Sequence, residues 1–214
     1  MKQIGIWAGI IVIFFVTTWG LIALVNSKGS VSSQVGIPPS ISKDDQVLGV
    51  STKVKAILIE YADFQCPACK NYALFVRQLK KDFGDDLLIA YRFFPLLGHQ
   101  NAMSSSQAAF AAAKQNKFWE MSDMIYENQE NWADSSNAED LFIGYAKKLD
   151  LDITQFTNDY NADPTKKFIT DQLNSGISIG INSTPTFFLN GKIIQNPQSY
   201  EAFKKLIQDE LKNQ

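Results

Sequence analysis

Cysteine and histidine are almost absent from this sequence. Cys66 and Cys69 are the only cysteines among its 214 residues, and His99 is the only histidine. A zinc site usually needs four Cys, His or acidic ligands, and the chain has no second Cys pair to supply them. We therefore expect no metal site, with a zinc ion shared between the Cys pairs of two chains as the alternative.

An excess of charge of either sign is also missing. The 20 basic and 22 acidic side chains give a formal net charge of −2, without a basic cluster or stripe. Proteins that bind nucleic acid usually carry such a cluster. We therefore expect neither nucleic acid nor acidic substrates as partners. The 45% of hydrophobic residues is ordinary for a chain that folds around a buried core.

One long hydrophobic run contains no charged residue. Residues 4–25 are rich in Ile, Val and Phe, with Trp7 and Trp19 toward the two ends. About 20 apolar residues span a bilayer as a helix, whereas the apolar part of a signal peptide is about 7–15 residues long. We therefore predict that residues 1–27 form an uncleaved single-pass transmembrane helix, with a cleaved signal peptide as the alternative.

Residues 28–46 lack a periodic apolar pattern and contain Ser, Gly and Pro, so we predict a flexible linker there. Signal-like anchors usually leave the following domain outside the cytoplasm. Both cysteines lie in one motif, so no stray thiol is left to mispair in an oxidising compartment. We expect the protein at the cell membrane, with its folded part on the extracytoplasmic side.

The two cysteines lie where a strand pattern gives way to a helix pattern. Cys66-Pro67-Ala68-Cys69 follows an apolar stretch at 54–61 and opens a helix to about residue 81. Pro67 suits the first turn of a helix, where its missing N–H is not needed. The free N–H groups at this helix end favour the thiolate of Cys66, and Cys69 lies one turn further in. The motif predicts a reversible disulfide, because a loop this short would make a weak structural disulfide.

Strand and helix patterns follow one another along the rest of the chain. In the helix that opens at Cys66 we expect Leu74, Phe75, Gln78 and Leu79 to form the buried face. Further strands are predicted at 87–94, 186–189 and 192–194, the last two joined by the turn Asn190-Gly191. Further helices are predicted at 102–117, 118–131, 138–149, 153–161, 164–176 and 199–211. We predict an α/β fold in which residues 47–98 and 177–214 form one domain and residues 99–176 are a helical insertion.

Three stretches resemble the DsbA-like branch of the thioredoxin superfamily. They are residues 60–69 (Glu-Tyr-Ala-Asp-Phe-Gln-Cys-Pro-Ala-Cys), residues 94–96 (Phe-Pro-Leu) and residues 180–191, which include Thr184-Pro185. The resemblance covers about residues 47–214 and implies a thioredoxin-like fold with an inserted helical subdomain. With its expected membrane anchor, the chain is similar to the tethered DsbA-like proteins of Gram-positive bacteria, the BdbD type.

The resemblance also implies roles for residues around the cysteines. Pro185 would be a cis-proline packed against the active disulfide, where the sequence alone also allows a trans proline at an edge strand. Thr184, with Pro67 and Ala68, would meet an extended substrate peptide. Glu60 matches the family's buried acid.

The sequence leaves the environment of Glu60 open. If it is buried near Cys69, its raised pKa would let it exchange protons with that thiol, but an exposed strand end is an equal alternative. For Asp63 we expect a structural role in capping the active-site loop or helix. For His99 we expect a polar cap and no part in catalysis.

The function implied by the resemblance is that of an enzyme without a bound cofactor. It is an extracytoplasmic thiol–disulfide oxidoreductase, a monomer that introduces disulfides into reduced or unfolded exported proteins through Cys66 and Cys69. A quinone-linked membrane partner of the DsbB or VKOR type would reoxidise it. The alternatives are a tethered disulfide reductase or isomerase of the same fold, or a non-enzymatic substrate-binding or assembly module.

The residues between the two cysteines set the expected strength of the oxidant. The best-known strong oxidant of the family has Pro-His there, whereas this chain has Pro67-Ala68. Alanine cannot stabilise the thiolate as histidine does. We therefore expect an oxidant milder than DsbA, with a pKa of Cys66 between about 3.5, as in DsbA, and about 8.5, as in a free cysteine.

Overall fold

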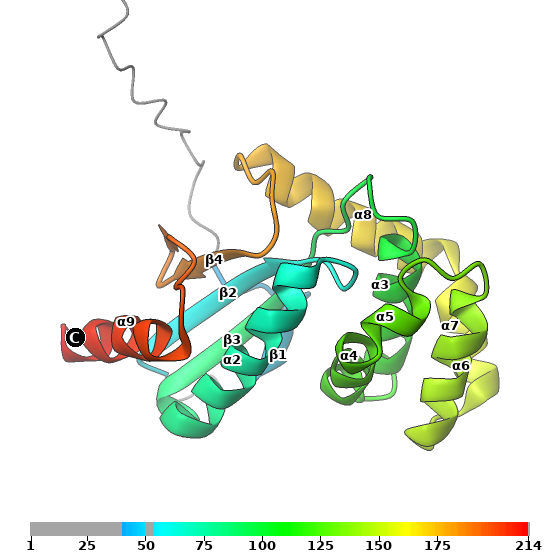
Figure 1. Cartoon of the computed structure of the whole chain (residues 1–214), viewed down its shortest axis with the longest axis horizontal. Helices are drawn as coiled ribbons and strands as arrows, with labels where there is room; N and C mark the ends of the chain where they lie inside the picture. The colour runs from blue at the N-terminus through cyan, green and yellow to red at the C-terminus, as the bar shows by residue number, and fades with distance from the viewer. Residues whose placement is uncertain (1–39, 50–53, 214) are drawn as a thin grey trace, which may run out of the picture. The chain divides into compact units, whose positions relative to one another are not determined.

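The structure is a computed structural model that describes residues 40–49 and 54–213 (Figure 1). The predicted transmembrane helix, residues 1–27, lies outside the described residues, as does the predicted linker up to residue 39. Within the two described ranges, no helix is both long and apolar enough to cross a membrane.

A five-stranded mixed sheet has the strand order β1-β3-β2-β4-β5. Its strands are β1 (Gln46–Leu48), β2 (Ala56–Ala62), β3 (Leu87–Phe93), β4 (Thr186–Leu189) and β5 (Lys192–Ile194). β2 is parallel to β3 and antiparallel to β4, and β1 is antiparallel to β3. The four predicted strands are confirmed with boundaries shifted by two residues or fewer. β1 was not predicted, because three residues beside a polar stretch are too few to show an alternating pattern.

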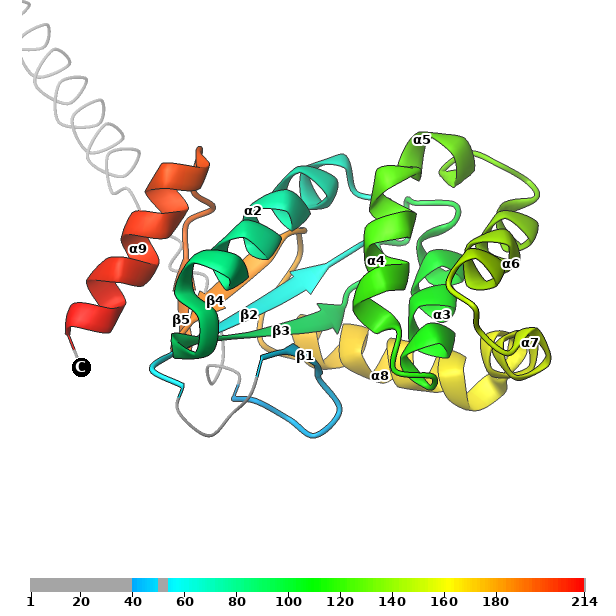
Figure 2. The same cartoon turned by 90° about the horizontal axis from the view of Figure 1, so that it is seen from below.

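Two helices pack on one face of the sheet, and a group of helices lies between β3 and β4 in the sequence. α2 (Pro67–Phe83) is followed by the short 3-10 helix η1 (Gly84–Asp86) and joins β2 to β3, and α9 (Tyr200–Lys212) ends the described chain. The group comprises α3 (Ala102–Ala113), α4 (Phe118–Glu127), α5 (Gln129–Trp132), α6 (Ala138–Lys148), α7 (Ile153–Asn161) and α8 (Asp163–Ser178). Figures 1 and 2 show α3 to α7 beside one end of the sheet.

Side chains on the two faces of the sheet enter different clusters, because successive residues of a strand point to opposite faces. Ala56 and Leu58 of β2 pack with Val76 of α2 and Phe203 of α9. Tyr61 belongs to the cluster on the other face, where the C-terminal part of α8 packs. Glu60 has the parity of Leu58 and therefore points to the face covered by α2.

The buried face of α2 differs from the predicted one. Cys69, Val76 and Leu79 are buried, whereas Leu74 and Gln78, which we expected on that face, are exposed, Leu74 by 70%. Leu74 lies five residues after Cys69, which turns it well away from the sheet at 3.6 residues per turn.

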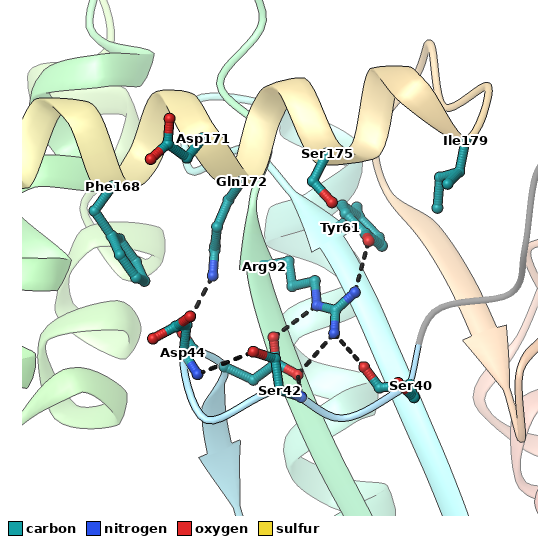
Figure 3. A pocket seen from close by; sticks show the side chains of 11 residues that line it. Ser40, Ser42, Asp44, Tyr61, Arg92, Phe168, Asp171, Gln172, Ser175 and Ile179 are labelled. Atoms are coloured by element: carbon teal, nitrogen blue, oxygen red, sulfur yellow. Dashed lines mark hydrogen bonds and ion pairs between the residues drawn. The ribbon is translucent and has the colours of Figure 1, made fainter.

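The described end of the predicted linker is bound to the sheet. Nε of Arg92 in β3 donates to Oδ1 of Asp45 at 2.6 Å, and Nη1 donates to the hydroxyl of Tyr61 at 2.7 Å (Figure 3). Nη2 of Arg92 donates to the carbonyl of Ser40 at 2.6 Å. Residues 40–45 are therefore not a free tether. The prediction failed because the partner of Asp45 lies 47 residues away in the sequence.

A cavity of about 440 Å³ lies between this segment and α8 (Figure 3). Its walls include Asp44, Phe168, Asp171 and Gln172. Neither cysteine lines it, so the cavity is separate from the dithiol.

Candidate active site

The dithiol lies where β2 leads into α2, as the sequence predicts. Cys66 is the N-cap residue of α2, with extended backbone angles, and Pro67 occupies the first turn. Both cysteines are free thiols. Cys66 is 7% exposed and Cys69 is completely buried, in one cluster with side chains of the helices beside the sheet. Pro67 and Ala68 are exposed, so the motif faces solvent between the two thiols.

The two thiols have opposite acid strengths. A side-chain hydrogen bond with Cys69 lowers the pKa of Cys66 to about 5, helped by Thr184 and by the backbone N–H groups of Cys69 and Ala68 against the effect of burial. This value lies between the limits expected from the sequence. Burial, and then the hydrogen bond with Cys66, raises the pKa of Cys69 well above 9.0. Near neutral pH the outer sulfur is therefore a thiolate and the inner one a thiol.

The Thr184–Pro185 peptide brings the end of the chain to the dithiol. It is cis, as the resemblance implied. The carbonyl oxygen of Thr184 lies 3.4 Å from Sγ of Cys66 and accepts its hydrogen bond when the thiol is protonated. Oγ1 of Thr184 is buried and has no hydrogen-bond partner among the described residues. Because the side chain of Thr184 lowers the pKa of Cys66, this hydroxyl is the group that can donate to the thiolate.

Glu60 is buried, which excludes the exposed strand end that the sequence left open. Its side chain is only 3% exposed, and Oε1 has no hydrogen-bond partner within the described part of the chain. Burial, and then the charge of Cys66, raises the pKa of Glu60 to about 8, with Arg77 opposing. The charge of Glu60 in turn raises the pKa of Cys69. Glu60 is therefore protonated at neutral pH and is electrostatically linked to both sulfurs.

A narrow crevice reaches Glu60 between α2 and α4. Arg77, Asp123 and Tyr126 line it together with Glu60, and about 10 Å³ of it is open to the centres of water molecules. That is room for about one water. The hydroxyl of Tyr126 is buried and lacks a protein partner among the described residues, as does Oε1 of Glu60.

Asp63 has the structural role that we expected, whereas His99 does not. Oδ1 of the fully buried Asp63 accepts a hydrogen bond from N of Gln65 at 2.7 Å, and Oδ2 accepts one from N of Leu96 at 2.8 Å. Asp63 thereby joins the active-site loop to the Phe-Pro-Leu loop. His99 is not the cap of α3, because the N-cap of that helix is Asn101. Nδ1 of His99 lies 2.7 Å from Oδ2 of Asp63 instead.

Three buried amides near the cysteines were missed in the sequence. Nε2 of Gln129 donates to the carbonyls of Phe64 at 2.7 Å and Cys66 at 3.1 Å. Gln65 and Asn101 bond to each other and to the turn after α5. For Gln65, its place next to Cys66 was a weak sign of a role at the site. No feature of the sequence singles out Gln129 or Asn101, because Asn and Gln are common on helix surfaces.

Among the described residues, no group of three or more His, Cys, Asp or Glu side chains is placed so that it could hold a metal ion. The dithiol, a buried acid and the Thr184–Pro185 peptide form one site. It places a thiolate beside a buried thiol and a protonated carboxyl group.

Comparison with known sequences gives the family of the chain. A family model described as thioredoxin matches residues 42–209. Among curated proteins, the chain is 36% identical over 140 residues to the Na(+)/H(+) antiporter NhaA 1 of Mycolicibacterium vanbaalenii, covering 63% of this chain and 22% of that protein. It is 31% identical over 182 residues to NhaA 3 of Salinispora tropica, covering 85% and 26%. The chain thus spans about a quarter of the length of these relatives.

Solved structures share the fold at low sequence identity. BdbD from Bacillus subtilis, in its oxidised form, has a TM-score of 0.73 and 23% identity, over 84% of this chain and 98% of BdbD. α-DsbA1 from Wolbachia pipientis has a TM-score of 0.71 and 19% identity, over 86% and 97%. MdbA, a thiol-disulfide oxidoreductase from Corynebacterium diphtheriae, has a TM-score of 0.65 and 18% identity, over 86% and 99%. The family match and this shared fold together show that the chain belongs to the thioredoxin family, with the architecture of its DsbA-like members.

Proposed function

We propose that this protein is an extracytoplasmic thiol–disulfide oxidoreductase that introduces disulfides into exported proteins. The observation that carries the proposal is the pairing of a Cys66 thiol with a pKa of about 5 and a Cys69 thiol with a pKa well above 9.0. A structural dithiol has no need of such a difference. Perturbed pKa values of this kind are typical of reactive cysteines.

In the first step, a substrate thiolate attacks Sγ of Cys66 in the oxidised enzyme. A bond forms between the two sulfurs, the Cys66–Cys69 bond breaks, and Cys69 leaves with the electron pair. Because the pKa of Cys69 is well above 9.0, this sulfur takes up a proton at neutral pH. Glu60 is the nearby acid, because burial, the largest cause of its raised pKa, also acts when Cys66 is in a disulfide and carries no charge.

In the second step, another substrate thiolate attacks the substrate sulfur of the mixed disulfide. The substrate disulfide forms and Cys66 leaves as a thiolate, so two electrons and the reduced dithiol remain on the enzyme. Cys66 is a good leaving group because its pKa is about 5. The two pH units between that value and pH 7 make the couple roughly 60 mV more oxidising than one with an ordinary thiol.

Turnover requires that the reduced dithiol be oxidised again. We propose a quinone-linked membrane protein of the DsbB or VKOR type as the oxidant, and a monomer anchored by residues 1–27. The likeness to BdbD and to MdbA supports the thiol–disulfide chemistry. We do not extend antiport to this chain, because the match covers only about a quarter of those relatives.

Two assays test the direction of the reaction. The oxidised full-length chain is mixed with reduced, unfolded ribonuclease A, and the regain of nuclease activity is followed; reduction of insulin by the reduced chain is measured in parallel. We expect oxidation to be faster than insulin reduction, and Cys66→Ser to abolish both. Insulin reduction without oxidation of ribonuclease would favour the tethered reductase. If Cys66→Ser still binds substrate as the wild type does and neither protein catalyses either reaction, the result would favour the non-enzymatic binding module.

A further inference from the structure

The short helix α5 is hydrogen-bonded to the active-site loop, residues 63–66, which joins β2 to α2. Nε2 of Gln129, the first residue of α5, donates to the carbonyl oxygen of Phe64 at 2.7 Å and to that of Cys66 at 3.1 Å. The Gln129 side chain is buried, so water does not readily replace these hydrogen bonds. One amide from the helices beside the sheet thus binds the peptide group before Gln65 and the peptide group after Cys66, on either side of the nucleophile.

Two more buried amides complete this connection. Nε2 of Gln65 donates to the carbonyl of Ala133 at 2.9 Å, and Oε1 of Gln65 accepts from N of Asn101 at 2.6 Å. Nδ2 of Asn101 lies 2.9 Å from the carbonyl of Trp132 and 3.0 Å from that of Ala133. The loop that carries Cys66, the start of α3 and the end of α5 are therefore joined through uncharged side chains.

One of the two carbonyls that Gln129 binds is that of Cys66, the N-cap residue of α2. The same oxygen of Cys66 accepts the hydrogen bond from N of Lys70 at 3.2 Å, which closes the first turn of the helix. The N–H groups of Ala68 and Cys69, which lower the pKa of Cys66, belong to that turn. Movement of the N-cap would therefore move the sulfur relative to the groups that stabilise its thiolate.

An amide suits this place better than a charged donor or acceptor. A cation beside the N-cap would attract the thiolate itself, and a carboxylate would repel it. Gln129 is neutral and can hold two carbonyl oxygens without either effect. The neighbouring ion pair between Lys70 and Glu130, at 3.3 Å, is exposed on the Glu130 side and makes no such contact.

We propose that Gln129 is a positioning residue for Cys66, holding the N-cap of α2 so that the thiolate stays against its hydrogen-bond donors. Gln65 and Asn101 hold the same loop, so displacement of α5 alters the reactivity of the thiol. This inference rests on the proposed thiol–disulfide chemistry at Cys66. It adds a dependence of that chemistry on the helices beside the sheet.

The test is the ionisation of Cys66 in the reduced full-length chain and in Gln129→Met. Methionine keeps the length of the side chain and its burial, but it cannot donate to either carbonyl. Glu130→Gln is the matched control, because it changes the adjacent residue, whose side chain is 91% exposed, and leaves Gln129 in place. Thiolate absorbance at 240 nm is followed between pH 3 and 9, together with the thermal melting of each variant.

We expect the pKa of Cys66 in Gln129→Met to rise by about one unit, the tenfold change in the ionisation equilibrium that follows when the shifted N-cap loses one of the hydrogen bonds to its thiolate. Alkylation by iodoacetamide at pH 5 should slow in parallel, and Glu130→Gln should match the wild type. A lower melting temperature with an unchanged pKa would show that Gln129 is merely structural and would overturn the inference.

A second variant covers the case in which Gln129→Met does not fold. Gln65 lies on the same loop as Cys66, and Gln65→Met removes its hydrogen bonds to Ala133 and Asn101. This variant should also raise the pKa of Cys66. An unchanged value in that variant would contradict the inference. A wild-type pKa near the ordinary thiol value would instead contradict the proposed function, and the inference would fail with it.

Discussion

At the scale of single residues, the site pairs two groups whose acid strengths are shifted in opposite directions. The pKa of Glu60 is raised from 4.5 to about 8 by burial, and that of Cys66 is lowered from 9.0 to about 5, first by its hydrogen bond with Cys69. Glu60 therefore favours the folded state below about pH 4.5 and loses this contribution as the pH rises to about 8. The Cys66 thiolate stabilises the folded state fully above about pH 9, and this stabilisation is lost as the pH falls to about 5.

The reduced wild-type protein should show little pH dependence of stability between pH 5 and 8, because the two contributions oppose each other. In Glu60→Gln the Cys66 contribution remains alone, so the free energy of unfolding should rise with pH. In Cys66→Ser it should fall with pH, over a range that ends below pH 8 because the charge of Cys66 no longer raises the pKa of Glu60. Urea unfolding at a series of pH values measures both slopes, and slopes of the same sign would contradict this account.

Thr184 offers a second test at this scale. Its buried hydroxyl lacks a partner among the described residues, yet it lowers the pKa of Cys66. Thr184→Val keeps the shape and removes the hydroxyl, so the pKa of Cys66 should rise. Below pH 5, where Cys66 is protonated, stability should not fall, because an unpaired buried hydroxyl is costly. At pH 7 stability should fall in step with the rise in the pKa of Cys66. Thr186→Val is the control, since that hydroxyl donates to the carbonyl of Ser183 at 2.8 Å. An unchanged pKa in Thr184→Val would exclude a role for the hydroxyl.

At the scale of helices and strands, the sequence predicted most elements and missed contacts between distant ones. Alternating and helical patterns are local, so they located β2, β3 and the helix after Cys66 within a few residues. They did not show that Asp45 pairs with Arg92 or that Gln129 binds the Cys66 loop, because those partners are 47 and 63 residues apart. Leu74 was misplaced, since one apolar residue can occupy an exposed helix face.

The segment before β1 gives a prediction at this scale. The Asp45 carboxylate is 1% exposed and pairs with Arg92, on the face of the sheet opposite to Glu60. Removing one partner of a buried ion pair typically costs about 3–5 kcal/mol. Asp45→Ala should therefore lower the free energy of unfolding by about that amount, while the pKa of Cys66 stays at its wild-type value. Asp44→Ala, an exposed neighbour, is the control. A changed pKa in Asp45→Ala would show that the segment is coupled to the active site.

At the scale of the whole molecule, the fold brings together a site whose parts are far apart in the sequence. Thr184 is 118 residues from Cys66, and the motif resemblance predicted that they meet because it rested on the order of three separate stretches. The environment of Glu60 could not be predicted in this way. Whether a strand residue is buried depends on the helix that covers its face, and here α2 covers it.

The redox state should change the stability of the whole protein. A thiolate at Cys66 exists only in the reduced form, and its low pKa stabilises that form. We therefore expect the reduced protein to resist urea better than the oxidised one at pH 7, and the difference to shrink below pH 5 as Cys66 is protonated. An oxidised form that is the more stable at pH 7 would contradict the assignment of the thiolate.

The most direct test of the central claim is the reduction potential of the Cys66–Cys69 pair in the full-length chain, equilibrated against glutathione at pH 7. We expect a value between those of thioredoxin and DsbA, which are about −270 mV and about −120 mV. Such a value would make the disulfide an oxidant of exported thiols. A value at or below that of thioredoxin would contradict the oxidase and identify a tethered reductase.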